Sequence, residues 1–274
     1  MAVRLFEGKE HASSYWRYRV SPPPELINKV LTFLKAHGDS VCELAVDVGC
    51  GSGQGTVLLA QHFSRVVGTD ISPAQLEQAL QHSTAPNISY RECPAEDLPF
   101  ENGSVDLVTA MSSFHWFDHP QFLQEADRVL KPGGCLAILN YSLDLELSYG
   151  HCSRELNLIC KEFYDSLQSH RHSHLGPGSR VLYEQIYNSL QYPVKEWEPS
   201  YWTQQVVPLS RYIGMMKSFS CYQLLLQKDP EEALRLSQDI TQRLLSAMKV
   251  TSLETEVTMA VRYFYLLACK PPSQ

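Results

Sequence analysis

The chain has 274 residues, of which 44% are hydrophobic, and a net charge of −7 at pH 7. This length fits one elaborated α/β unit, and no apolar run approaches the roughly 20 residues that span a bilayer. The first residues, MAVRLFEGKEHASSYW, lack the apolar centre of a secretory signal. Because long runs of like charge are also absent, general nucleic-acid binding is disfavoured. We expect a cytoplasmic protein with neither membrane nor nucleic-acid partners.

Residues 1–40 read as an N-terminal extension, in which three prolines precede a helical pattern over 25–35. From 41 to 141 the pattern alternates between strands and helices. The expected strands are 43–48, 65–70, 87–91, 105–111 and 134–140, and the expected helices or turns are 55–63, 73–82 and 119–130. This alternation predicts βαβ units, and hence a parallel sheet with helices on both faces.

Residues 142–250 change character. Helical patterns lie near 153–168, 179–190, 208–227 and 230–248. We expect this region to be a helical insertion that covers the ligand-binding end of the sheet. The last apolar run, Val257–Cys269, lies within a segment, 251–274, that would complete the sheet with its last strand.

Neither the cysteines nor the histidines predict a metal site. The eight cysteines form no CxxC pair, which favours reduced thiols that act as small apolar fillers. His170, His172 and His174 alternate in a polar loop without a nearby acidic or cysteine cluster. We therefore predict a solvated loop and no metal.

The stretch LAVDVGCGSGQGT, Leu44–Thr56, runs from an apolar strand into Gly49, Gly51 and Gly53. Glycines at this point let the backbone approach a ligand and adopt positive φ. No lysine follows, as a P-loop requires, and the sixth position from Gly49 is Gln54, so the dinucleotide pattern GxGxxG fails. With Asp47 two residues earlier, the pattern suits a ligand with a ribose and an amino-acid tail, such as S-adenosylmethionine (SAM).

The next expected strand, RVVGTDIS, carries Asp70 near its end, 17 residues beyond Gly53. An acid at about this spacing grips ribose hydroxyls in related sheets. The alternative is that Asp70 caps the helix after it. Ser72, directly before Pro73, suits that capping role better, so we assign Asp70 to the ribose.

These residues resemble motif I of the class I SAM-dependent methyltransferases, and the resemblance extends over roughly 40–140. Three further segments carry it: YRECPAEDLPF (90–100), VDLVTAMSSFHWFD (105–118) and RVLKPGG (128–134). SSFHWFD and the N-terminal YWRYRVSPPPE are also similar to a subfamily that includes trans-aconitate methyltransferases. The resemblance implies a Rossmann-like, doubly wound, seven-stranded sheet that is mostly parallel with an antiparallel last strand.

The resemblance also implies a set of cofactor contacts. Asp47 would reach the SAM amino group, Gly49, Gly51 and Gly53 would lie under the methionine and ribose, Asp70 would hold the ribose, Ile71 would pack on the adenine face, Ala95 and Glu96 would meet the adenine edge, and Ser112 would complete the site. One position departs from the pattern, because many relatives have an acid where this chain has Pro94. The adenine amino group is therefore bound by Glu96, by a backbone carbonyl or by water.

Methyl transfer depends mainly on positioning, so the lack of a Ser/His/Asp constellation is no objection. His115 and Trp116 are the active-site candidates, although FHWF also reads as the packed start of a helix. Arg19, beside Tyr18, would grip a carboxylate from an N-terminal lid, unless it lies on the surface. Residues from the insertion that would line the acceptor pocket or pack in the core are Trp202, Tyr212 and Tyr222.

The leading hypothesis is a SAM-dependent methyltransferase that acts on a small molecule, with a carboxylic acid as the suggested acceptor. A non-catalytic SAM-binding or scaffold protein is the second hypothesis. An NAD-dependent oxidoreductase is the third, and the failed dinucleotide pattern disfavours it.

Overall fold

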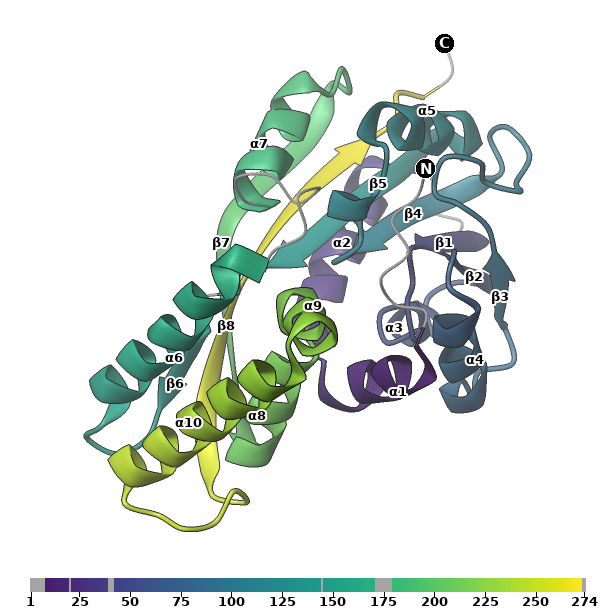
Figure 1. The fold of residues 1–274 in the computed structure, drawn as a ribbon. Helices are drawn as coiled ribbons and strands as arrows, with labels where there is room; N and C mark the ends of the chain where they lie inside the picture. The colour runs from purple at the N-terminus through teal and green to yellow at the C-terminus, as the bar shows by residue number, and fades with distance from the viewer. Residues whose placement is uncertain (1–7, 20, 39–41, 144, 171–178, 273–274) are drawn as a thin grey trace.

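The computed structural model describes residues 8–19, 21–38, 42–143, 145–170 and 179–272, and a twisted sheet forms its centre (Figure 1). The strands are β1 (Leu44–Val48), β2 (Arg65–Asp70), β3 (Ile88–Glu92), β4 (Val105–Met111), β5 (Leu130–Tyr141), β6 (Glu146–Ser148), β7 (Val194–Pro208) and β8 (Glu256–Cys269). The helices are α1 (Lys9–Tyr18), α2 (Pro24–His37), α3 (Thr56–Leu59), α4 (Pro73–His82), α5 (His119–Val129), α6 (Ser153–Leu167), α7 (Ser179–Ser189), α8 (Leu209–Lys217), α9 (Ser220–Lys228) and α10 (Pro230–Met248), with short 3₁₀ turns η1 (Phe114–Trp116) and η2 (Gln168–His170).

The first half of the sheet is parallel. Its strand order is β3-β2-β1-β4-β5, and each neighbouring pair runs in the same direction. All five residues of β1 are buried, as expected for a strand covered by helices on both faces. In such a sheet the turns at the carboxyl ends of the strands form the ligand-binding edge, so this half of the fold determines where the site lies.

The second half of the sheet is antiparallel. β8 pairs antiparallel with β5 through Cys135–Tyr141 and, along its other edge, with β7. The short strand β6 continues the β5 side by pairing with β8 at Thr258–Ala260. The predicted antiparallel last strand is confirmed, whereas the described residues form eight strands where seven were expected.

The predicted helical insertion, 142–250, also contains strands, which the sequence pattern did not predict. Residues 194–208 form the long strand β7, which adds to the sheet edge, and 146–148 form β6. Pro199 obscured β7 in the sequence, because proline inside an apolar run argues against a strand. The structure accommodates it at an edge, where the register shifts between Glu198 and Tyr201. This edge strand is half exposed, so its residues need not be consistently apolar.

Helices α6, α8, α9 and α10 pack beside the N-terminal end of β8 and form a lobe (Figure 1). Helix α1 lies between this lobe and α4. One hydrophobic cluster runs without interruption from the sheet into the lobe, where it includes Leu156 of α6, Tyr212 of α8 and Leu244 of α10. The lobe is therefore an extension of the sheet domain rather than a domain with its own core. The N-terminal extension is more helical than expected, since α1 precedes the predicted α2.

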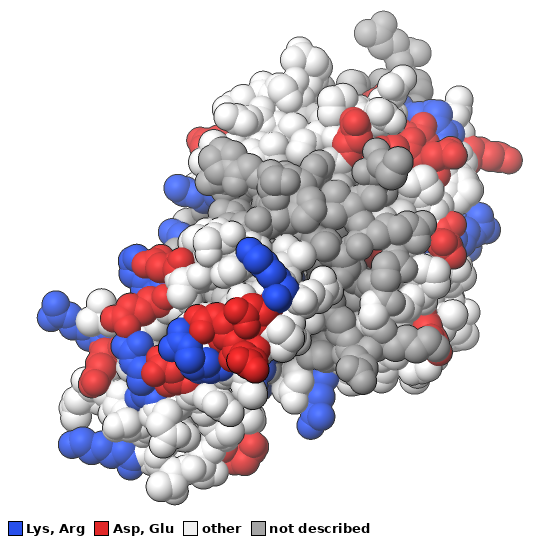
Figure 2. All heavy atoms as spheres, in the orientation of Figure 1, with Lys and Arg blue, Asp and Glu red and all other residues white. Residues whose placement is uncertain are grey.

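The outer face of the lobe carries both charge signs in close alternation (Figure 2). Arg235 pairs with Glu232 on α10, and Arg243 pairs with Glu162 of α6. Within the described ranges, no helix is long and apolar enough to cross a membrane.

Candidate active site

The turn after β1 takes a conformation that favours glycine. Gly49, Gly51 and Gly53 have φ values of 65°, 55° and 83°, in the left-handed region that other residues avoid. A Cβ atom at Gly49 would lie 2.6 Å from Cβ of Ser113, and one at Gly53 would lie 2.5 Å from the Tyr90 hydroxyl. These two glycines thus also let the loop pack against the β4 turn and β3.

Asp47 lies on β1, directly before this turn, and is 1% exposed. Its two carboxylate oxygens accept hydrogen bonds from the hydroxyls of Thr56 and Thr109, at 2.7 and 2.8 Å. Burial raises the pKa of Asp47 to about 6, and the two hydroxyls only partly offset this rise. At neutral pH the site thus holds a buried carboxylate that a ligand cation would stabilise.

Asp70 holds the glycine loop from the end of β2. Its carboxylate accepts hydrogen bonds from the backbone N–H groups of Gly51 (2.8 Å) and Ser72 (2.9 Å). The N-cap of α4 is Ser72, whose hydroxyl accepts from the Gln75 N–H, so the predicted capping role of Ser72 is confirmed. The ribose role of Asp70 stays a prediction. Asp70 therefore ties the second glycine of the motif to the start of α4.

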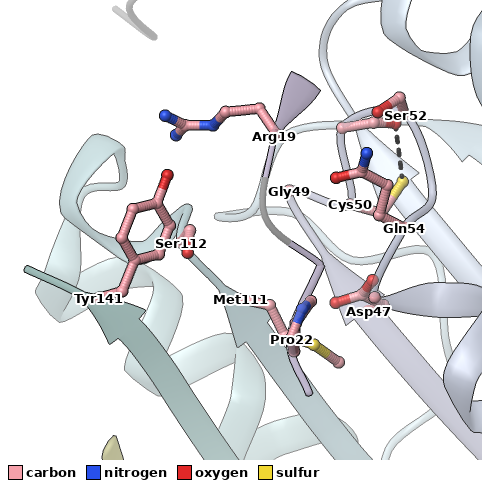
Figure 3. A pocket seen from close by; sticks show the side chains of 12 residues that line it. Arg19, Pro22, Asp47, Gly49, Cys50, Ser52, Gln54, Met111, Ser112 and Tyr141 are labelled. Atoms are coloured by element: carbon pink, nitrogen blue, oxygen red, sulfur yellow. Dashed lines mark hydrogen bonds between the residues drawn. The ribbon is translucent and has the colours of Figure 1, made fainter. Parts of the chain in front are cut away.

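A pocket opens above the glycine loop (Figure 3). Its lining residues come from β1 and the glycine loop, from the ends of β4 and β5 and from the N-terminal segment. They are Arg19, Pro22, Asp47, Gly49, Cys50, Gly51, Ser52, Gln54, Gly55, Met111, Ser112 and Tyr141. The predicted residues that meet here are Asp47, Gly49, Gly51, Ser112 and Arg19. Ser112 has a φ of 60°, which is strained for a residue other than glycine, and such strain concentrates at functional sites.

Arg19 and Tyr141 lie on one side of the pocket, with Asp47, Cys50, Ser52 and Gln54 across from them (Figure 3). The guanidinium carbon of Arg19 lies 5.4 Å from the ring centre of Tyr141 and 5.2 Å from that of Phe219. Contacts with two aromatic faces fix the direction of the cation. The prediction that Arg19 lies over the site rather than on a remote surface therefore fits the geometry.

Five predicted cofactor residues lie outside the pocket lining, namely Gly53, Asp70, Ile71, Ala95 and Glu96. Ala95 is buried beside the sheet and Ile71 is half buried. The Glu96 carboxylate accepts a hydrogen bond from the N–H of Asp118 at 2.7 Å, so it braces the loop after β3 against the start of α5.

His115 and Trp116 occupy η1, beyond the β4 turn, and neither lines the pocket. A ring nitrogen of His115 lies 3.4 Å from the side-chain amide of Asn140 on β5. Phe114 is fully buried in the core, as the packed interpretation of FHWF predicts. His115 is half exposed, and its role in an active site stays a prediction.

The other candidates fall elsewhere. Tyr212 and Tyr222 are buried in the core. Trp202 is 44% exposed on β7, beneath the guanidinium of Arg262, so the expectation that it packs in the core or lines the pocket is wrong. His170 ends η2, whereas His172 and His174 lie outside the described residues. Among described residues, no group of three His, Cys, Asp or Glu side chains is placed to hold a metal ion.

Sequence reasoning missed several residues of the site. Thr56 and Thr109 hold Asp47, and Tyr141 and Phe219 hold Arg19. Thr109 carried a usable signal, because a hydroxyl inside an otherwise apolar buried strand needs a partner. No local pattern marks Phe219, whose contact with Arg19 depends on how the lobe folds back.

The donor set fits SAM. The buried Asp47 carboxylate matches an ammonium group, and Asp70 at the end of β2 matches vicinal hydroxyls. The Ser52 hydroxyl also lines the pocket, is buried and has no hydrogen-bond partner within the described structure. Because buried hydroxyls are normally paired, this one is available to hydrogen-bond a ligand in the pocket.

Comparisons with known proteins agree with this site. Residues 46–138 match the family model described as a methyltransferase domain. A Dictyostelium discoideum protein named as a methyltransferase is 37% identical over 132 residues, covering 48% of each chain. A solved structure from Anaeromyxobacter dehalogenans, described as a type II methyltransferase, superposes with a TM-score of 0.74 at 24% identity, covering 93% of this chain and 100% of that chain.

A third match is the Haemonchus contortus phosphoethanolamine N-methyltransferase 2, solved with phosphomonomethylethanolamine and S-adenosylhomocysteine. It superposes with a TM-score of 0.54 at 19% identity, covering 98% of this chain and 60% of that chain. The fold is that of these solved methyltransferase structures. Residues 46–138 match a methyltransferase domain. The chain spans about half the length of the curated relatives that it matches.

Proposed function

We propose that the protein transfers the methyl group of SAM to a small-molecule acceptor that carries a carboxylate, as in the trans-aconitate methyltransferase-like subfamily. The observation that carries this proposal is the composition of the pocket, in which the glycine loop and Asp47 share one opening with Arg19 and Tyr141. One end suits the cationic amino-acid tail of the cofactor, and the other presents a guanidinium to an anion.

Within the pocket, Asp47 would hold the SAM amino group, while Gly49 and Gly51 leave room for the ligand beside the backbone. Asp70, which holds the glycine loop from the end of β2, would hold the ribose at the margin of this pocket. Ser52 would supply a further hydrogen bond from its buried hydroxyl. The loop that contains Ala95 would lie beside the adenine. Bound SAM supplies a methyl group on a sulfonium whose departure leaves a neutral thioether, so no residue has to protonate the leaving group.

The pocket favours an acceptor that is already ionised. A phenol or an amine generally needs a base to remove its proton, yet among the described lining residues the only carboxylate is Asp47, whose oxygens are both engaged by threonines. Burial also raises the pKa of the Cys50 thiol well above its ordinary value, which keeps it neutral. A carboxylate needs no base, and a guanidinium positions it well.

His115 is a candidate for a second, narrower role, which is contact with the acceptor outside the pocket lining. It lies near the β4 turn and is placed by Asn140, so it would contact an acceptor that extends beyond the described pocket lining, with Trp116 beside it.

Two other classes of protein stay as alternatives. A scaffold that only binds SAM would release no S-adenosylhomocysteine, and an NAD-dependent oxidoreductase would bind NAD in place of SAM.

The test is an incubation of the protein with methyl-labelled SAM and a panel of small carboxylic acids, followed by a metabolite extract, with S-adenosylhomocysteine measured throughout. We expect label to enter an acid as a methyl ester. Arg19→Ala should lower kcat/KM for that acid about 10- to 150-fold, which corresponds to about 1.5–3 kcal/mol, and should leave SAM affinity nearly unchanged.

The matched control is Arg154→Ala, which removes an exposed arginine of α6 and should change kcat/KM little. Label that enters only amines or phenols would contradict the carboxylate. A loss of SAM affinity in Arg19→Ala would place the guanidinium on the cofactor instead.

A further inference from the structure

Gly214 is a glycine in the middle of α8, where the sequence has no local reason for one. Glycine is among the weakest helix formers because its unfolded backbone has the most freedom to lose. Gly214 is buried, and its carbonyl accepts a hydrogen bond from the Ser218 N–H. It neither begins nor ends the helix, so its use there points to a close approach by another group.

That group is Tyr18. A Cβ atom built on Gly214 would overlap three ring carbons of Tyr18, so the tyrosine ring lies directly on the helix backbone. Core atoms cannot interpenetrate, and a single added methyl group in a packed contact forces a displacement. Gly214 therefore determines how closely the end of α1 approaches the lobe.

Arg19 follows Tyr18 directly and extends to the same corner of the lobe. Its guanidinium lies against Phe219, which stands between α8 and α9, and against Tyr141 at the end of β5. The contact of Tyr18 with Gly214 and the direction of Arg19 are thus consecutive in the chain and adjacent in space. A shift of Tyr18 away from α8 carries the backbone of Arg19 with it.

The same segment is anchored on the cofactor side. The side-chain amide of Gln54, in the glycine loop, donates a hydrogen bond to the Trp16 carbonyl at 2.6 Å. The Trp16 ring stacks on His82 at the end of α4, with 3.6 Å between ring centres and an interplanar angle of 17°. Residues 16–19 therefore bridge the glycine loop and the lobe.

We propose that Gly214 is a positioning residue for the acceptor side of the pocket: it seats Tyr18 on α8 and thereby holds Arg19 at the pocket wall. The proposal rests on the proposed function in one respect, namely that Arg19 contacts the acceptor. The packing of residues 12–19 can be measured without any acceptor, so the two ideas can fail separately.

The primary experiment is hydrogen–deuterium exchange of the backbone amides of 12–19 in the full chain, for the wild type, Gly214→Ala, Tyr18→Ala and the double variant. We expect each single variant to speed exchange in 12–19 about tenfold or more. The double variant should exchange no faster than Tyr18→Ala, because the added methyl group then has no ring to displace. Amides of α8 itself should be no less protected, since alanine is the better helix former.

Arg211→Ala is the matched control, because Arg211 is exposed on the same helix and should leave 12–19 unchanged. With the acid found by the labelled-SAM screen, Gly214→Ala should raise KM about tenfold with a much smaller change in kcat. A wild-type chain that releases no S-adenosylhomocysteine overturns the proposed function. Unchanged exchange at 12–19 in Gly214→Ala, or additive effects in the double variant, overturns this inference alone.

Discussion

Asp47 is the residue in which the demands of folding and of ligand binding conflict most directly. It lies on a fully buried strand, and two threonine hydroxyls compensate only part of the cost of its charge. A hydrophobic or neutral residue would suit the core better. The retention of an acid at this position is understandable where a ligand supplies the missing positive charge.

This conflict predicts a pH dependence. The folded pKa of about 6 lies above the ordinary value of 3.8, so the folded state binds the proton more tightly than the unfolded state. The tighter binding of this proton stabilises the folded state. That stabilisation is fully present below pH 3.8 and is lost as the pH rises through 6. Above that pH the ionised group costs up to about 3 kcal/mol.

Asp47→Asn should accordingly raise the free energy of unfolding of the ligand-free protein by about 1–3 kcal/mol at pH 7.5, and by less at pH 5. Urea unfolding at both pH values measures the difference, and Asp165→Asn, at an exposed position on α6, is the control. The same variant should bind SAM more weakly. A less stable Asn variant at pH 7.5 would mean that the charge is satisfied inside the protein.

At the scale of elements, the loop between β3 and β4 depends on one arginine of α5. Arg128 donates hydrogen bonds to the carbonyls of Leu98 and Phe100, to the Asn102 side chain and to Glu125, each at 2.8 Å. Glu125 in turn accepts from the Leu98 N–H. A loop without regular structure is thereby held against a helix by a network of charge-assisted bonds.

Arg128→Ala should therefore lower the free energy of unfolding by about 1–3 kcal/mol and raise hydrogen exchange across 93–104. SAM affinity should fall several-fold, because this loop contains Ala95 and Glu96. Arg235→Ala, which removes an exposed pair on α10, should cost well under 1 kcal/mol. Unaltered exchange in the loop would show that it is held by other contacts.

Local patterns predicted those elements whose signals are short-range. The strand-to-glycine turn at 44–56, the Ser72 cap of α4 and the terminal strand all depend on neighbouring residues, and the structure has each of them. β7 escaped prediction because an edge strand tolerates polar residues and Pro199. The positions of Phe219 and Gly214 beside residues 18–19 depend on the tertiary fold, which spacing along the chain does not reveal.

For the whole molecule, the pocket lies at the junction of three segments that are remote in sequence. The parallel half of the sheet supplies the glycine loop, β5 supplies Tyr141, and the N-terminal segment supplies Arg19. The lobe continues the core of the sheet and holds Arg19 from behind through Phe219. The two sides of the pocket are thus joined through one continuous hydrophobic cluster.

The measurement that tests the central claim most directly is a calorimetric titration of the full chain with SAM and, separately, with NAD. We predict one SAM site and no binding of NAD. Asp70→Ala should weaken SAM binding about 30- to 1000-fold, or about 2–4 kcal/mol, because two charge-assisted bonds to the ligand are lost along with the support of Gly51. Asp239→Ala, at an exposed position on α10, should bind like the wild type. Binding of NAD in preference to SAM, or wild-type affinity in Asp70→Ala, would contradict this account of the site.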